Sequence, residues 1–124
     1  MTHQARQHRG RRNFLQGAAA EDRVANHYQA SGYTLGAKRW RGKSGELDLV
    51  FCAGDDIVIV EVKSSSTFDA ALAMVTQSKA ARILAAAAEY LCTAPLGLAT
   101  PTRIDVACVN AMGEIDILEN ALGH

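Results

Sequence analysis

Several features that would place this chain in a specialised class are missing from its sequence. No apolar run approaches the ~18 residues of a membrane-spanning helix, and the four histidines are too scattered to form a zinc site. The three cysteines, Cys52, Cys92 and Cys108, are odd in number, far apart and without a CxxC spacing. We therefore expect free thiols in a reducing cytoplasm, with Cys52 and Cys108 buried in strands.

An export signal is not expected either, although the N-terminal region contains a similar motif. The run Arg11–Leu15 looks like a twin-arginine signal. Such a signal requires an apolar segment of about 7–15 residues next, whereas Gly17–Ala20 leads directly into the charged Glu21–Arg23. The expected location is therefore the cytoplasm.

The charge of the whole chain gives no support for a nucleic-acid partner, because 13 basic and 13 acidic residues give a net charge of zero. The distribution is more informative. Residues 1–63 contain ten Lys/Arg against seven Asp/Glu, whereas residues 64–124 contain three against six. A chain of 124 residues is most simply one domain, so the basic excess lies in its first half.

The stretch Gly45–Lys63 has the pattern of two strands joined by a tight turn. In the first strand, Glu46–Cys52, apolar side chains alternate with others, which is typical of a strand. After the turn-forming residues Ala53–Asp56, the second strand is apolar on both faces, as in the centre of a sheet. Glu61 and Lys63 nevertheless share one of its faces, because side chains two residues apart point the same way.

The length of the hairpin loop decides whether two acids meet. A loop of two or four residues centred between Gly54 and Asp55 places Asp48 opposite Glu61, with Cβ atoms about 5 Å apart. A loop of three residues shifts the register by one and puts the two acids on opposite faces. Two carboxylates this close on a buried strand repel each other and lose hydration. They require a cation between them, which is either Lys63 or a divalent metal ion.

The first 13 residues form a basic segment with Arg6, Arg9, Arg11 and Arg12 and no periodic apolar pattern. A disordered, solvated tail is the preferred interpretation, and a basic arm that contacts phosphates is the alternative. The folded domain is accordingly expected to comprise residues 14–124.

Residues Phe14–Ser31 follow a helical pattern, and Gly32 is well placed to end the helix. Glu21 falls inside the apolar stripe of this helix, which includes Val24 and Tyr28. A carboxylate on the inward face of a helix is costly unless it is paired. Glu21 therefore either belongs to a buried acidic site or lies at the edge of the stripe, where it reaches solvent or pairs with an arginine.

A basic loop is expected between a first strand, Tyr33–Arg39, and the hairpin. The loop spans Lys38–Gly45 and contains the only tryptophan, Trp40. Its cations are Lys38, Arg39, Arg41 and Lys43. Because the loop leads into the acidic hairpin, it is suited to bring a phosphate backbone towards the acids. A solvated connection with Trp40 packed on the core is the alternative.

The rest of the chain is expected to add helices and strands to the hairpin. Ser64–Thr67 and Thr76 offer N-caps for two helical segments, although one continuous helix also fits the pattern. The order helix, three strands, helix and one or two strands predicts an α/β fold with a mixed sheet flanked by helices. The expected elements are helices at Phe68–Val75 and Gln77–Cys92, a loop at Ala94–Pro101, a strand at Arg103–Val109 and an edge strand at Ile115–Leu118.

Asp48 and the tripeptide Glu61–Lys63, with Glu21 on the preceding helix, resemble the catalytic pattern of the PD-(D/E)xK nuclease superfamily. More specifically, residues 14–110 resemble the YraN family of uncharacterised bacterial proteins, relatives of archaeal Holliday junction resolvases. Glu-x-Lys alone is weak, whereas GELDL followed at this distance by VEVK is specific. The motifs are Gly17, Glu21 and Ala25; Gly32-Tyr33; Gly45–Leu49; Val60–Lys63; Lys79; and Arg103–Val106.

The resemblance implies a restriction-endonuclease-like αβββαβ core and a metal-dependent endonuclease that hydrolyses phosphodiester bonds in DNA, including branched DNA. Asp48 and Glu61, with the backbone carbonyl of Val62, are the implied ligands of Mg²⁺ or Mn²⁺, which are hard ions that prefer oxygen.

The resemblance also implies roles for further residues and for a second copy of the chain. Lys63 would orient or help deprotonate the attacking water and offset developing phosphate charge. Glu21 would complete the acidic cluster, and Gln77 or Lys79 would contact the phosphate. A homodimer is implied by analogy, because a four-way junction offers symmetric cuts.

The chain departs from the family pattern in one stretch, where Ser64–Ser66 replaces the basic and aromatic residues that usually follow Glu-x-Lys. The proline of the superfamily name is also absent, with Leu47 in its place, as is normal in this family. Two alternatives to an enzyme stay open. One is a non-catalytic nucleic-acid-binding module that keeps the fold. The other is a protein-interaction domain in which Asp48, Glu61 and Lys63 form only a buried charge network.

Overall fold

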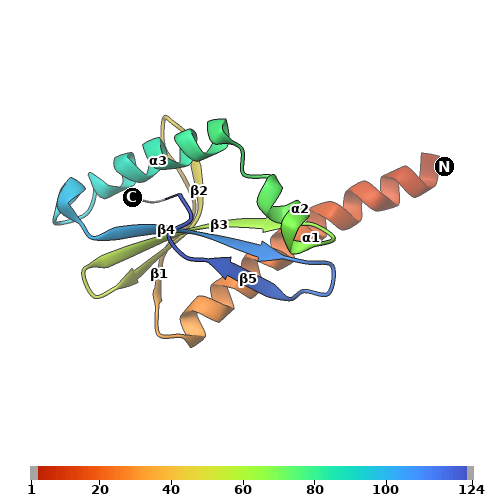
Figure 1. Ribbon diagram of the computed structural model, residues 1–124, viewed down its shortest axis with the longest axis horizontal. Coiled ribbons are helices and arrows are strands. Elements are labelled where there is room, and N and C mark those ends of the chain that lie inside the picture. Colours follow the sequence, from red (N-terminus) through yellow and green to blue (C-terminus); the bar gives the residue numbers. More distant parts are fainter. Residues whose placement is uncertain (1–2, 123–124) are drawn as a thin grey trace.

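The computed structural model describes residues 3–122, with side chains described from Gly17 onward. A five-stranded sheet lies between helix α1 on one side and helices α2 and α3 on the other (Figure 1). The elements are α1 (His3–Ala30), β1 (Thr34–Arg41), β2 (Glu46–Ala53), β3 (Asp56–Ser64), α2 (Phe68–Ala73), α3 (Gln77–Leu91), the 3₁₀ turn η1 (Gly97–Ala99), β4 (Thr102–Val109) and β5 (Ile115–Leu118).

The sheet has the order β1-β2-β3-β4-β5 and is mixed. The pairs β1–β2, β2–β3 and β4–β5 are antiparallel, whereas β3 and β4 are parallel. A parallel pair needs a crossover connection, and α2 and α3 provide it between β3 and β4. The predicted α/β fold with a mixed, helix-flanked sheet is therefore confirmed, and β3 lies at its centre.

Helix α1 begins at His3, whereas the sequence predicts a disordered tail over residues 1–13. The described helix includes the backbone of residues 3–13, and the domain boundary at residue 14 stays a prediction. The side chains of the four tail arginines lie outside the described residues, so their contact with phosphates stays a prediction. After the helix, Gly32 has a φ of 98°, the left-handed conformation expected of its terminating residue.

The cations predicted to lie in a loop belong mostly to strand β1. Lys38, Arg39 and Arg41 are part of this strand, and only residues 42–45 connect it to β2. A hydrogen bond of 2.9 Å between the first N–H and the last carbonyl of this connection closes a tight turn. The predicted loop was wrong because the segment pairs with β2 as far as Arg41, which lies opposite Glu46.

A two-residue loop joins β2 to β3, because Ala53 pairs directly with Asp56. The first loop residue, Gly54, has a φ of 62°, which hairpin turns of this length favour. Loops of two, three and four residues were open from the sequence. The observed loop sets the register in which Asp48 comes across from Glu61.

Three hydrophobic clusters fill the faces of the sheet, and the smallest joins Ala71 of α2 to Val106 and Cys108 of β4. Under α1, Val24 and Tyr28 pack on the side chains of β2, β3 and β4. Under α3, Ile83 and Leu91 pack on the other face. The most completely buried large side chains are Phe51, Leu47, Leu49, Ile59, Val24, Val50, Val60 and Val106.

Leu47 lies on the opposite side of the sheet from the one that strict alternation predicts. Leu49 belongs to the cluster under α1, whereas Leu47 packs with Trp40 under α3. The cause lies in β1, where Arg39 has a φ of 53° in the left-handed region and interrupts the pleat. Because Lys38 pairs with Leu49 and Trp40 with Leu47, the two strands change face together at Arg39.

The crossover contains two helices, each with the threonine cap that the sequence predicts. Thr67 Oγ1 accepts a hydrogen bond from Ala70 N at 3.1 Å, and Thr76 Oγ1 accepts one from Lys79 N at 3.3 Å. Within residues 3–122, no helix combines the length and apolarity needed to cross a membrane. The three cysteines are free, as expected; Cys108 is buried, Cys52 half-buried and Cys92 exposed.

Candidate functional site

Strands β2 and β3 separate where the two predicted acids lie. Their ladder runs from the hairpin turn to Leu49 opposite Val60 and stops one pair before Asp48 and Glu61. Asp48 Oδ2 instead accepts a hydrogen bond of 2.8 Å from Val62 N. A side-chain carboxylate thus takes the place of a backbone carbonyl as the acceptor of this N–H.

Glu61 projects into this region from the central strand and is only 6% exposed. Its Oε2 is the one buried side-chain oxygen or nitrogen without a hydrogen-bond partner among the residues described. Buried polar atoms in folded proteins are almost always paired, and an unpaired one costs about 1–3 kcal/mol. An unsatisfied carboxylate oxygen on the central strand is therefore suited to bind a ligand.

Lys63 compensates the negative charge of Glu61 only in part. Its Nζ lies 3.6 Å from Glu61 Oε1, a distance that makes an ion pair but not a short hydrogen bond. Burial and the nearby charge of Asp48 raise the pKa of Glu61 to about 8, although Lys63 acts in the opposite direction. The sequence left two candidates for the cation between the acids, Lys63 or a divalent metal ion. The structure contains Lys63 there, and its single positive charge does not balance the two carboxylates.

The donor atoms at this place fit a hard divalent cation. Asp48 and Glu61 supply carboxylate oxygens, and one oxygen of Glu61 has no competing partner. The N–H and C=O of one strand residue point towards the same neighbouring strand. Because Val62 N donates to Asp48, its carbonyl also faces β2. An all-oxygen set of this kind suits Mg²⁺ or Mn²⁺.

Glu21 pairs with an arginine of strand β1, and its predicted role in the acidic cluster stays a prediction. Its Oε2 accepts a hydrogen bond of 3.0 Å from Arg39 Nε. Within the part of the chain whose side chains are described, no three His, Cys, Asp or Glu side chains converge as a metal-binding group. The structure agrees with the alternative in which Glu21 pairs with an arginine at the edge of the apolar stripe.

Arg39 connects Glu21 to the acidic hairpin. Its hydrogen bond to Glu21 is the largest cause of a raised arginine pKa, and the charges of Glu46 and Asp48 add to it. The guanidinium therefore lies within electrostatic reach of three carboxylates on α1 and β2.

The other predicted nucleic-acid contacts are exposed, and two of them pair with acids. Lys38 Nζ lies 2.8 Å from Asp22 Oδ1, and Arg41 Nη2 lies 3.0 Å from Glu46 Oε2. Lys43 forms no ion pair with any residue of the described part of the chain. Exposed pairs of this kind contribute about 0–1 kcal/mol, so phosphates can replace the acids at little cost.

Gln77 and Lys79 lie in the first turn of α3, and both are exposed. Neither side chain forms a hydrogen bond or ion pair with another described residue, including the two acids of the hairpin. Their predicted contact with a phosphate stays a prediction.

Sequence reasoning missed Glu89, a residue of α3 that holds the turn between β1 and β2. Its two carboxylate oxygens accept hydrogen bonds of 3.0 Å from Lys43 N and Ser44 N. A Cβ on Gly42 would clash with the Glu89 carboxylate and the Trp40 ring, so a side chain there would displace the carboxylate from this position. Trp40 packs edge-on against Tyr90 beside this contact, which agrees with the alternative that placed it on the core. The only signal in the sequence was the pair of glycines around the turn.

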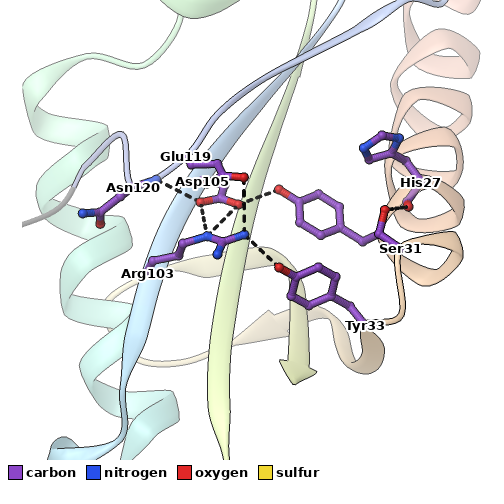
Figure 2. A network of polar contacts seen from close by, with 8 residues as sticks. His27, Ser31, Tyr33, Arg103, Asp105, Glu119 and Asn120 are labelled. Carbon is purple, nitrogen blue, oxygen red and sulfur yellow. Dashed lines mark hydrogen bonds and ion pairs between the residues drawn. The ribbon is translucent and has the colours of Figure 1, made fainter. Parts of the chain in front are cut away.

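Sequence reasoning also assigned no role to Asp105, which is completely buried on β4. Figure 2 shows its carboxylate among donors from α1, β4 and the C-terminal segment. Oδ2 accepts from Tyr28 Oη at 2.7 Å, and Oδ1 accepts from Arg103 Nε at 3.0 Å and from Asn120 N at 2.9 Å. Arg103 in turn donates to Tyr33 Oη at 3.2 Å. This network ties α1, the start of β1, β4 and the C-terminal segment together.

Comparison with known proteins identifies relatives along almost the whole chain. The model of the uncharacterised protein family UPF0102 matches residues 20–109. A UPF0102 protein of Ruegeria pomeroyi is 47% identical over 116 residues, which is 94% of both chains. One from Ruegeria sp. (strain TM1040) is 44% identical over 124 residues, covering 100% of this chain and 99% of the relative. One from Roseobacter denitrificans is 43% identical over 120 residues, or 97% and 93% of the two chains. The chain therefore belongs to the UPF0102 family, which is the YraN family that its motifs indicate.

Proposed function

We propose that the protein is a metal-dependent phosphodiesterase that hydrolyses the backbone of DNA at the site formed by Asp48, Glu61 and Lys63. The observation that carries this proposal is the unpaired, buried Oε2 of Glu61 beside a second carboxylate and a lysine. In a purely structural charge network, buried carboxylate oxygens normally have hydrogen-bond partners. A free carboxylate oxygen is what a cation-binding site requires, and this favours the proposal.

Three residues would hold the ion: Asp48 and Glu61 through carboxylate oxygens, and Val62 through its backbone carbonyl. When bound, Mg²⁺ or Mn²⁺ supplies Lewis-acid stabilisation of the phosphate charge and increases the acidity of water at the site. The carboxyl group of Glu61, with a pKa of about 8, has to release its proton before it can serve as a ligand at neutral pH.

Lys63 is the residue suited to act on the substrate. Its ammonium group is largely buried beside Glu61, where the effective dielectric constant is low and each charge has a larger effect than in water. It would orient the attacking water and stabilise the charge that develops on the phosphate oxygens. The basic strand β1 runs along β2 and supplies the side chains that would contact the flanking phosphates.

Cleavage of defined DNA substrates tests the proposal. A four-way junction, a flap and a single strand are incubated with Mn²⁺ and either the wild type, Asp48→Asn or Lys63→Ala. We expect the wild type to cleave at least one of them, and both variants to lose about 10²–10³-fold in rate, as removal of a charge-stabilising group typically does. Asp116→Asn, an exposed carboxylate on β5, is the matched control and should cleave normally.

Two results would contradict the proposal. Binding of DNA without cleavage, unchanged in Asp48→Asn, would favour a nucleic-acid-binding module that keeps the fold. Failure of the wild type to bind Mn²⁺ in a calorimetric titration would remove the metal site itself, since that measurement needs no substrate.

A further inference from the structure

The ion pair between Glu21 and Arg39 joins a half-buried residue to an exposed one. The side chain of Glu21 is 15% exposed and that of Arg39 is 52% exposed. Only Nε of the guanidinium is engaged, at 3.0 Å from Glu21 Oε2. Among the side chains that the structure describes, none forms a hydrogen bond or ion pair with the two terminal nitrogens of Arg39. The arginine is thus fixed at its inner edge while its outer edge is open.

Arg39 lies across from Asp48 in the β1–β2 ladder, since Lys38 pairs with Leu49 and Trp40 with Leu47. Arg39 has a φ of 53°, in the left-handed region. This conformation is costly for residues other than glycine, asparagine or aspartate. Strained backbone of this kind persists where the surroundings impose it, and it is concentrated at functional sites. Here it interrupts the pleat across from Asp48 and places the arginine there.

The terminal nitrogens of a guanidinium form a planar fork that matches two oxygens of a phosphate. Holding the group at Nε leaves this fork free and limits the rotation of a long side chain. The contact with Glu21 therefore acts as a brace, and it leaves Glu21 with one oxygen already bound to a cation. A carboxylate in that arrangement is poorly suited to be a third ligand of the metal.

We propose that Arg39 binds an oxygen of the substrate phosphate beside Asp48, and that Glu21 is the residue that positions it rather than a metal ligand. This inference rests on the proposed phosphodiesterase function and changes the role that family resemblance gives to Glu21. It predicts that the two residues act as one unit, so that loss of either has the effect of losing both.

A double-mutant cycle tests the inference. The variants are Glu21→Gln, Arg39→Gln and the double variant, with single-turnover cleavage of DNA measured in Mn²⁺. Each single variant should lower the rate by about tenfold or more, because misplacement of a catalytic contact costs up to about 10²-fold. The double variant should be no slower than the slower single variant. Arg39→Lys, which keeps the charge but not the fork, should recover little of the rate.

Two readouts separate positioning from a general structural or electrostatic role. First, the affinity for Mn²⁺, measured by calorimetry without DNA, should stay within about twofold in Glu21→Gln. Second, the affinity of Glu21→Gln for DNA should not fall, because the substitution removes a negative charge near the substrate, whereas Arg39→Gln should reduce the salt slope of binding by about 0.9. The matched control is Asp22→Asn, which breaks the neighbouring Lys38 pair and should leave the cleavage rate unchanged.

Several outcomes would overturn the inference. A loss of about tenfold or more in Mn²⁺ affinity for Glu21→Gln would make Glu21 a metal ligand. Additive effects in the double variant would show that the two residues act independently. Both results presuppose a wild type that cleaves DNA. If the wild type binds no Mn²⁺ or cleaves no DNA, the proposed function fails first and the inference fails with it.

Discussion

Asp105 and Glu61 are two buried carboxylates on neighbouring strands, and their surroundings are opposite. Asp105 on β4 pairs across the sheet with Val60, the residue before Glu61, and faces α1. Its two oxygens accept hydrogen bonds from a tyrosine, an arginine and a backbone N–H. Glu61 faces the other side of the sheet, where it has one distant lysine, one neighbouring acid and one oxygen without a partner.

Hydrogen bonding distinguishes a structural carboxylate from a candidate functional one more clearly than burial does, because both carboxylates are buried. The network of Asp105 raises the pKa of Tyr28, through burial and then the hydrogen bond, and the pKa of Arg103, chiefly through its hydrogen bond to the carboxylate. Both raised pKa values keep Tyr28 and Arg103 in their ordinary charge states at neutral pH. Glu61 is held away from its ordinary state. A complete shell of donors indicates a role in stability, and an incomplete one indicates a site for a ligand.

The largest expected effect is on Asp105. Asp105→Ala leaves Arg103 and Tyr28 facing a buried gap, and breaking a buried pair in this way costs about 3–5 kcal/mol. Urea denaturation at pH 7 should show this loss in the free energy of unfolding. A loss below about 1 kcal/mol would mean that Asp105 is no better satisfied than Glu61, and the comparison would fail.

Tyr28→Phe removes one donor from the same carboxylate and should cost about 1–2 kcal/mol, the usual range for a hydrogen bond to a charged group. The stacking of the ring on Phe51, with centroids 4.8 Å apart, is kept. Tyr33→Phe is the control, because its hydroxyl contacts Arg103 at 3.2 Å and not the carboxylate. Equal losses for the two variants in denaturant titrations would show that the buried acid is not the centre of the network.

Glu61→Gln should have the opposite sign and raise the stability of the metal-free protein by roughly 1 kcal/mol at pH 8, because it removes the repulsion by Asp48. The pKa of Glu61 in the folded protein, about 8, lies above its ordinary value of 4.5. The folded state therefore holds the proton more tightly than the unfolded state, and stability falls as the pH rises from about 4.5 through about 8.

The variant should flatten this fall, and the free energy of unfolding measured between pH 5 and about 8.5 checks it. Glu114→Gln, an exposed acid in the turn before β5, is the control for loss of one negative charge. A wild type whose stability does not decline over this range would contradict the raised pKa and the strain attributed to the site.

The smallest effect is expected at the surface pair of Arg41 and Glu46. Their side chains are 80% and 35% exposed, so the ion pair at 3.0 Å is well solvated. Glu46→Gln should change stability by less than about 0.5 kcal/mol, as exposed pairs usually do. A loss comparable to that of Tyr28→Phe would show that an ion pair matters here without burial.

The hairpin that carries the site was predictable because its determinants are local. Gly54 and Asp55 favour a two-residue turn, and the pleat then fixes which residues face each other. The side on which Leu47 lies was not predictable, because a left-handed residue on the neighbouring strand changes it. Arg39 gave no such signal, since the left-handed region is usually occupied by glycine or asparagine.

The contacts of Glu21 and Asp105 depend on segments that are far apart in the sequence. Periodicity shows that Glu21 faces inward, but the identity of its partner follows from the position of β1 against α1. The surroundings of Asp105 combine residues 28, 103 and 120, and no spacing along the chain brings these together. Long-range polar contacts are specified by the assembled fold and not by a local pattern.

The two hydrogen bonds that Glu89 accepts from the turn between β1 and β2 constrain the order in which substitutions can accumulate at positions 42 and 89. Any side chain at position 42 would push the Glu89 carboxylate off two backbone N–H groups and crowd Trp40. A lineage that acquires a larger residue at position 42 first would lose the anchor of its basic turn. The reverse order, in which position 89 becomes small first, removes the clash with the Glu89 carboxylate before a side chain appears at position 42. The two positions are therefore expected to be epistatic, although 46 residues separate the atoms that meet.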